Sequence, residues 1–153
     1  MNWANLFFSP EGRIGRGEFW IAFLILTAAH MVVHFIPLIG TAFWIYLGVC
    51  VYSKRLHDMG KSGWWQILPA VATVILVSAG VVMGGFGIFM AVAAGNTNAA
   101  TGALMAFGGL LVLALIWLAV HLIFTLWVGL TAGEPGDNRY GPAPAPVSAG
   151  VGV

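Results

Sequence analysis

The chain has 153 residues, of which 60% are hydrophobic and only 7% are charged, and its formal net charge is +1. A soluble domain carries about 25% charged residues, so this composition excludes a water-soluble globular protein. The six basic and five acidic side chains fall in three short patches, 11–18, 54–61 and 134–139. The uncharged runs between these patches exceed the roughly 20 apolar residues that a bilayer-spanning helix needs.

The chain begins with an expected interfacial segment, residues 1–18. Its aromatic residues suit the headgroup region, while Pro10 and Gly12 argue against one continuous helix and predict a loop after a short element. The first uncharged run then predicts two short spans, at about 19–35 and 41–56, separated by a turn at Pro37 and Gly40. One long kinked span is the alternative for this run.

The second uncharged run predicts two longer spans, at about 64–93 and 103–130. The glycine-rich region 84–102 is consistent with either a continued helix or an outer loop. The predicted fold is therefore an all-α membrane protein in which residues 19–130 form four transmembrane helices, arranged as two helical hairpins. Residues 131–153 form a tail that is expected to be disordered at its end.

Four spans place all three charged patches on the same face of the membrane. The positive-inside rule makes that face cytoplasmic, with both chain termini on it. A single kinked first span would put the basic patches on opposite faces, which the same rule disfavours. We therefore expect the three patches to form a polar cap on the cytoplasmic side.

Residues 54–65 carry the densest mixture of charges, glycines and tryptophans. The turn from Gly60 to Gly63 superficially resembles a phosphate loop, but Arg55 stands where that loop needs glycine, and a membrane helix precedes it. Two interpretations remain. The segment is a tight turn between helices, or it binds an anion or lipid headgroup, with Ser62 capping the next helix and Arg55 and Lys61 supplying charge.

His57 and Asp58 are adjacent and are not expected to face each other. Asp58 is better placed to pair with Arg55 or Lys61, three residues away on a helix. An enzyme that uses His57 and Asp58 as acid and base is the least favoured hypothesis, because no second carboxylate is fixed nearby. A metal site in this turn lacks enough ligands.

Three histidines lie inside the predicted spans. His30 and His34 are four residues apart and share one helix face, and His121 lies at a similar depth, roughly 15 Å from the cytoplasmic end of its span. Such a set suits a metal site or a proton relay. The alternative is neutral histidines hydrogen-bonded between helices. Gly80 and Gly84 form a small-residue face suited to helix packing.

Three motifs, at 12–20, 54–65 and 136–142, resemble those of the bacterial inner-membrane family catalogued as domain of unknown function 805. They occur in the family's order, and the likeness covers nearly the whole chain. Lys54 departs from the pattern, where arginine is commoner, and lysine lacks the bidentate fork, so position 54 is given no recognition role. The resemblance implies a small multi-pass protein of the bacterial inner membrane and implies no activity.

We therefore expect a non-enzymatic scaffold or accessory protein without a cofactor, whose cap binds lipid headgroups, an anion or a partner. Membrane lipids, a second copy or another membrane protein are the expected partners, and nucleic acid is not. The alternative is a small transporter or channel subunit that uses its intramembrane histidines for metal or proton handling. The expected cap residues are Arg13, Arg16, Arg55, His57, Asp58, Lys61, Ser62, Gly63, Asn138, Arg139 and Tyr140.

Overall fold

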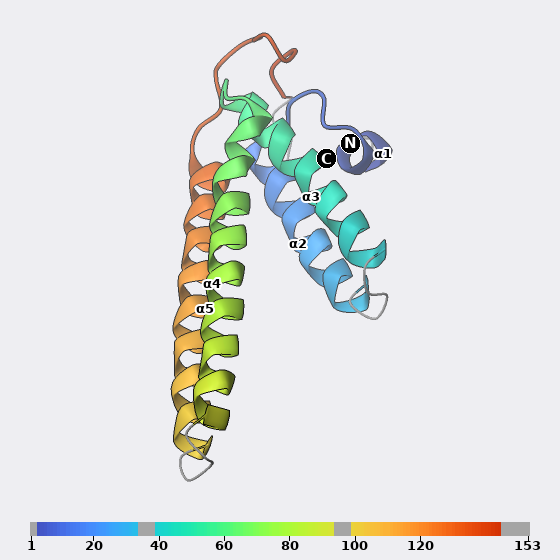
Figure 1. Ribbon diagram of the computed structural model, residues 1–153. Coiled ribbons are helices and arrows are strands. Elements are labelled where there is room, and N and C mark those ends of the chain that lie inside the picture. Colours follow the sequence, from blue (N-terminus) through green and yellow to red (C-terminus); the bar gives the residue numbers. More distant parts are fainter. Residues whose placement is uncertain (1–2, 34–38, 94–98, 145–153) are drawn as a thin grey trace, which may run out of the picture. The chain divides into compact units, whose positions relative to one another are not determined.

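The computed structural model describes residues 3–33, 39–93 and 99–144 (Figure 1). Within these ranges the chain forms five α-helices and one 3-10 helix. It divides into two compact units, one comprising Met1–Gln66 with Leu126–Val153 and the other comprising Ile67–Thr125. The expected end of the disordered tail and the turn at Pro37 lie outside the described residues.

The first unit contains α1 (Trp3–Phe8), α2 (Arg16–Val33), α3 (Ile39–Asp58) and the 3-10 helix η1 (Gly63–Gln66). Helices α2 and α3 run antiparallel, since the Phe19 ring packs edge-on against Tyr52 and the Trp44 indole Nε1 donates to the Leu26 carbonyl, 3.0 Å away (Figure 1). The buried apolar residues of this unit include Leu6, Ile14, Phe19, Ala22, Leu26, Cys50, Val51 and Leu56.

Local hydrogen bonds explain where α2 begins and α3 ends. Glu18, in the first turn of α2, accepts a 3.2 Å bond from the Gly15 amide and so satisfies a donor that the helix leaves unpaired. At the end of α3, the Lys61 amide donates to the Leu56 carbonyl and the Gly60 amide donates to the His57 carbonyl. Gly60 has a φ of 67°, so this is a Schellman ending that requires a left-handed residue.

The second unit consists of α4 (Ile67–Ala93) and most of α5 (Ala99–Leu130). The two helices run antiparallel, and glycines mark their points of contact (Figure 1). A Cβ added at Gly80 would lie 3.3 Å from Leu110 Cδ2, and one added at Gly109 would lie 2.8 Å from Met83 Cε. Close packing here depends on the missing side chains. Helix α4 continues through Gly84 to Ala93, and residues 94–98 lie outside the described residues.

Two helical stretches, Gly63–Met90 and Phe107–Leu130, are long and apolar enough to cross a membrane. Few of their residues are buried within the protein, only 11% and 6% in the most apolar windows, whereas a core helix of a soluble protein is mostly covered. Helices α2 and α3 are shorter, with 18 and 20 residues, and carry charges at one end. Spanning by these two helices stays a prediction.

Candidate functional site

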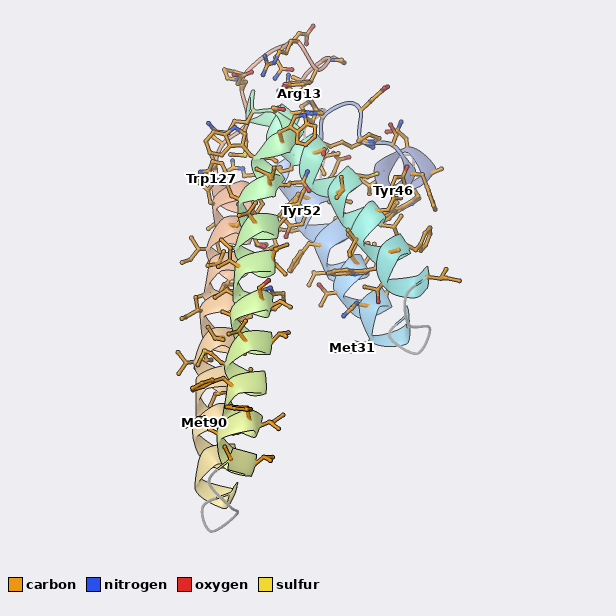
Figure 2. All side chains as sticks on the ribbon, in the orientation of Figure 1. Arg13, Met31, Tyr46, Tyr52, Met90 and Trp127 are labelled. Atoms are coloured by element: carbon orange, nitrogen blue, oxygen red, sulfur yellow. The ribbon has the colours of Figure 1, made fainter. Side chains whose placement is uncertain are left out.

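A buried carboxylate, Asp58, lies at the centre of the polar residues of the first unit. Arg13 contacts its Oδ1 at 3.0 Å, and Arg55 pairs with its Oδ2. The side chains of Arg13 and Arg55 are 1% and 0% exposed, and that of Asp58 is 5% exposed, so this ion triad is shielded from water. The triad joins the loop before α2, which carries Arg13 (labelled in Figure 2), to the last turn of α3.

Arg13 uses every donor of its guanidinium group. Its Nε and Nη2 both donate to Asp58 Oδ1, at 3.2 and 3.0 Å. The remaining protons reach three backbone carbonyls of the C-terminal segment, those of Glu134, Gly136 and Gly141, at 2.8, 2.7 and 3.3 Å. Since a guanidinium has five N–H groups, Arg13 keeps none to offer a ligand.

Arg55 closes the C-terminal end of α5. Its Nε donates to the Val128 carbonyl at 3.1 Å, and its Nη2 donates to the Thr131 carbonyl. Its Nη1 faces Asp58 and the Ile14 carbonyl. The last carbonyls of a helix lack partners within the helix and carry partial negative charge, so a buried cation is well matched to them.

Lys54 is also buried, with 1% exposure, and it fastens α1 to α3. Its ammonium group donates to the backbone carbonyl of Asn5 and, at 2.9 Å, to the Asn5 side-chain oxygen. The Lys54 carbonyl in turn accepts from the Ile14 amide at 3.4 Å. Sequence reasoning missed Lys54 and Asn5 as members of the cap. The available signal was a lysine within a helix otherwise free of charge for fifteen residues before it.

His57, Tyr140 and Arg139 form a stack on one side of the triad. The rings of His57 and Tyr140 are parallel within 5° and their centroids lie 3.9 Å apart, while the Arg139 guanidinium carbon lies 4.7 Å from the Tyr140 centroid. His57 Nδ1 lies 3.2 Å from the Gly12 carbonyl, and since that oxygen only accepts, Nδ1 carries the proton. Burial lowers the pKa of His57 and nearby Arg139 adds to that effect, so the neutral imidazole is favoured.

Asn138 holds the C-terminal segment in place. Its amide group donates to the His57 carbonyl at 2.9 Å and to Glu134 Oε2 at 2.8 Å, and its side-chain oxygen accepts from the Tyr140 amide. The Glu134 amide donates to the Asp58 carbonyl at 2.7 Å. Side chain and backbone of this segment are therefore both tied to the end of α3.

Two glycines permit this close approach. A Cβ at Gly133 would overlap the Asp58 carboxylate, with the carboxyl carbon only 2.6 Å away, and a Cβ at Gly60 would overlap the carboxylate of Glu134. Any larger residue at Gly133 would push the carboxylate away from its two arginines. Gly133 and Glu134 are further cap residues that sequence reasoning missed, because nothing in their local pattern predicts a contact with position 58.

The remaining predicted cap residues lie around the rim. Arg16 is exposed, and Lys61 lies 5.2 Å from the ring centroid of Trp65 and 5.8 Å from that of Trp127. Ser62 Oγ accepts from the Trp64 amide at 3.3 Å, as a cap of η1 rather than of α4, which begins at Ile67.

Gly63 packs so closely on Ser53 that a Cβ would lie 2.7 Å from its Oγ. Arg139 donates to the Gly60 carbonyl at 3.4 Å, and no ion pair joins it to the described carboxylates of Glu11, Glu18 or Asp58. The stack on Tyr140 fixes its guanidinium away from those carboxylates, and the ion pairs of the described residues are the two at Asp58.

His30 and His121, the two described histidines of the predicted spans, each have neighbours within their own unit. The His30 ring lies 4.5 Å from that of Trp44 within the first unit, whereas His121 contacts Trp117 and Thr73 within the second. His34 lies outside the described residues. Among the residues that the structure describes, no group of three His, Cys, Asp or Glu side chains is arranged to hold a metal ion.

These observations define an all-α protein with two helices apolar enough to cross a membrane and a buried ion cluster joining distant parts of its sequence. The sequence model of one family, described as protein of unknown function (DUF805), matches residues 29–142. The chain belongs to this family, which confirms the resemblance seen in its motifs.

Two curated relatives, both described as uncharacterized protein YiiR, come from Escherichia coli strain K12 and Escherichia coli O157:H7. Each is 37% identical over 79 residues, which covers 45% of this chain and 54% of the relative. The chain therefore spans about half the length of the curated relatives it matches. No solved structure matches the chain at a significant level.

Proposed function

We propose that this protein is a non-enzymatic, four-span protein of the bacterial inner membrane, with both termini cytoplasmic, which acts as a scaffold or accessory protein. In this proposal the ion triad of Arg13, Arg55 and Asp58 is a structural lock, and the rim around it contacts lipid headgroups. The main support for the proposal is that the buried charged groups bind to one another and to backbone carbonyls of the same chain. Both arginines donate to Asp58 and to backbone carbonyls.

The contacts of Asp58 and His57 support a non-enzymatic role. A general base needs an available lone pair within reach of a substrate. Asp58 has one arginine on each carboxylate oxygen, and the His57 ring is covered by Tyr140 on one face. Asp58 is therefore unavailable to orient the His57 ring or to relay a proton to it.

Lys61 supports contact with lipid. It is a cation held over the rings of Trp65 and Trp127, and Trp64 beside it is 78% exposed. Tryptophan and lysine concentrate where a membrane meets water, because each has an apolar body and a polar end. A cytoplasmic leaflet with anionic lipids attracts such a cation with about 1 kcal/mol.

Retained lipid tests this role directly. Purified protein in mixed micelles of phosphatidylglycerol and phosphatidylcholine is examined by native mass spectrometry. We expect bound phosphatidylglycerol, with a roughly fivefold weaker retention in Lys61→Gln and little change in Lys61→Arg, which keeps the charge. Equal retention in Lys61→Gln, or no anionic lipid on the unaltered protein, would count against the proposal.

Reporter fusions test the topology separately. A reporter at position 97 is expected to give a periplasmic signal, and one at position 150 a cytoplasmic signal. A periplasmic signal at 150 would overturn the four-span arrangement, because an even number of spans returns the C-terminus to the starting side.

The alternative of a transporter built on three intramembrane histidines receives less support. His30 and His121 belong to different compact units, and each has aromatic and polar neighbours of its own.

A further inference from the structure

The second compact unit contains one ionisable side chain. Residues 67–125 include no Asp, Glu, Lys, Arg, Cys or Tyr, and His121 is their single histidine. It lies on α5, in one of the two stretches apolar enough to cross a membrane. Ionisable groups are rare and costly in such segments and commonly serve ion or proton handling. Within this unit α4 and α5 carry no charged side chain that could face His121.

Four contacts, two of the imidazole ring and two of the Thr73 hydroxyl, form one network. Nδ1 lies 2.9 Å from the Trp117 carbonyl, one turn earlier on α5. Nε2 lies 3.2 Å from Thr73 Oγ1 on α4. The same hydroxyl accepts from Trp117 Nε1 at 3.0 Å and lies 2.9 Å from the Pro69 carbonyl, to which it is able to donate. The network therefore links both helices through one histidine and one threonine.

The donors and acceptors of this network determine which protonation states of His121 it can satisfy. A carbonyl oxygen only accepts, so Nδ1 must carry a proton in any satisfied state. In the neutral state Nε2 is then an acceptor, and the Thr73 hydroxyl donates to it. In the charged state Nε2 carries a second proton and donates to Thr73 Oγ1, and the hydroxyl turns to donate to the Pro69 carbonyl. Trp117 Nε1 donates to the same oxygen in both states.

When His121 is charged, all four hydrogen bonds form at once. When it is neutral, only the bond from the Thr73 hydroxyl to the Pro69 carbonyl is lost. The Pro69 carbonyl still has the helical N–H of residue 73 as a partner. The other neutral tautomer, with the proton on Nε2, would set the Nδ1 lone pair against the Trp117 carbonyl and is disfavoured. A single hydroxyl rotation thus accommodates the gain or loss of one proton without moving either helix.

We propose that His121 is a proton-binding site in the α4–α5 unit, and that the Thr73 hydroxyl is its two-position hydrogen-bond partner. The ligand is a proton, taken up on Nε2 while Nδ1 stays bonded to the Trp117 carbonyl. Uptake changes the charge of this apolar unit from zero to one. A metal ion is a poorer occupant, since it needs several ligating side chains and one imidazole supplies a single ligand.

Nitrogen NMR of the imidazole rings tests the site. Full-length protein labelled with 15N in histidine is placed in lipid nanodiscs and titrated between about pH 8 and pH 5, the range over which imidazoles commonly ionise. The nitrogen shifts distinguish imidazolium from each neutral tautomer, and His121→Gln identifies the signal. We expect the neutral form to carry its proton on Nδ1 and to convert to imidazolium as the pH falls.

Two matched substitutions test the role of the hydroxyl. Thr73→Val removes the acceptor for the charged ring and keeps the side-chain shape, so the ratio of imidazolium to neutral imidazole should fall roughly tenfold at a given pH. Thr73→Ser keeps the hydroxyl and should change the ratio less than about threefold. Circular dichroism checks that each variant keeps its helices.

Three results would overturn the proposal. In the first, His121 stays neutral down to about pH 5. In the second, its neutral form carries the proton on Nε2. In the third, Thr73→Val leaves the ratio unchanged while the protein remains folded. Lipid retention at Lys61 is unaffected by any of these outcomes, so the two proposals fail independently.

Discussion

Asp58→Asn removes the one negative charge that lies between Arg13 and Arg55. The substitution keeps the size of the side chain and one carbonyl oxygen, but both guanidinium groups remain buried without a counter-charge. Asparagine also presents an amide NH₂ where Asp58 presented an acceptor, so one arginine faces a donor. The cap is then expected to loosen where the C-terminal segment meets α3.

The size of the effect follows from the burial of the triad. Breaking a buried ion pair by removing one partner costs about 3–5 kcal/mol, since it leaves an unpaired charge in a poorly solvated place. The oxygen retained by asparagine keeps one weak contact, so we expect the lower end, about 3 kcal/mol. In a domain of this size that corresponds to a fall of roughly 6–12 °C in melting temperature.

Thermal unfolding in one fixed detergent, followed by circular dichroism, measures the change. Glu11→Gln is the matched control, because it neutralises an exposed carboxylate and should alter stability by less than about 0.5 kcal/mol. Adding Arg13→Leu to Asp58→Asn should cost less than the sum of the single changes, since it removes one stranded charge. If Asp58→Asn unfolds at the same temperature as Glu11→Gln, the triad is not a stabilising lock.

Three further expectations follow from the same cap. Arg55→Lys should lower stability by about 2 kcal/mol in the same melting assay, because an ammonium group has no fork to reach both Asp58 and the end of α5. Burial lowers the pKa of His57, so the unfolded chain binds its proton first, and stability should fall as the pH drops through about 6.5, a slope that His57→Gln removes. Gly133→Ala should destabilise by about 1–3 kcal/mol through its clash with Asp58, whereas Gly84→Ala, which meets nothing within 4 Å, should be neutral or slightly stabilising.

The approximate positions of the helices can be predicted from the apolar runs of the sequence. The residues at which the helices begin and end cannot. The uncharged run predicts that the first span begins at about residue 19. Helix α2 instead begins at Arg16, because the Glu18 carboxylate accepts a hydrogen bond from the Gly15 amide. The third helix was expected from 64, but Gly63–Gln66 form a 3-10 turn, and α4 begins at Ile67. Helix ends depend on individual hydrogen bonds, which hydropathy does not report.

The sequence indicates many of the residues that meet in the cap, but few of the contacts that they make there. Motif order and topology brought Arg13, Arg55, Asp58 and Asn138 to one place, and the pairing of Asp58 with Arg55 follows from helical spacing. Both arginines also donate to backbone carbonyls. These bonds depend on the fold of the C-terminal segment, which has no periodic pattern from which it could be predicted. The same holds for Lys54, whose partner Asn5 lies 49 residues away.

The contacts of Arg55 have a consequence for the order in which the chain assembles during synthesis. The carbonyls that receive its guanidinium belong to Val128 and Thr131, and those that complete Arg13 belong to residues 134–141. Each arginine therefore gains its full set of acceptors only after residues 128–141 have left the ribosome. In a nascent chain that stops before this segment, several donors of Arg13 and Arg55 stay bonded to water, so the polar cap is complete only after residue 141 has been made.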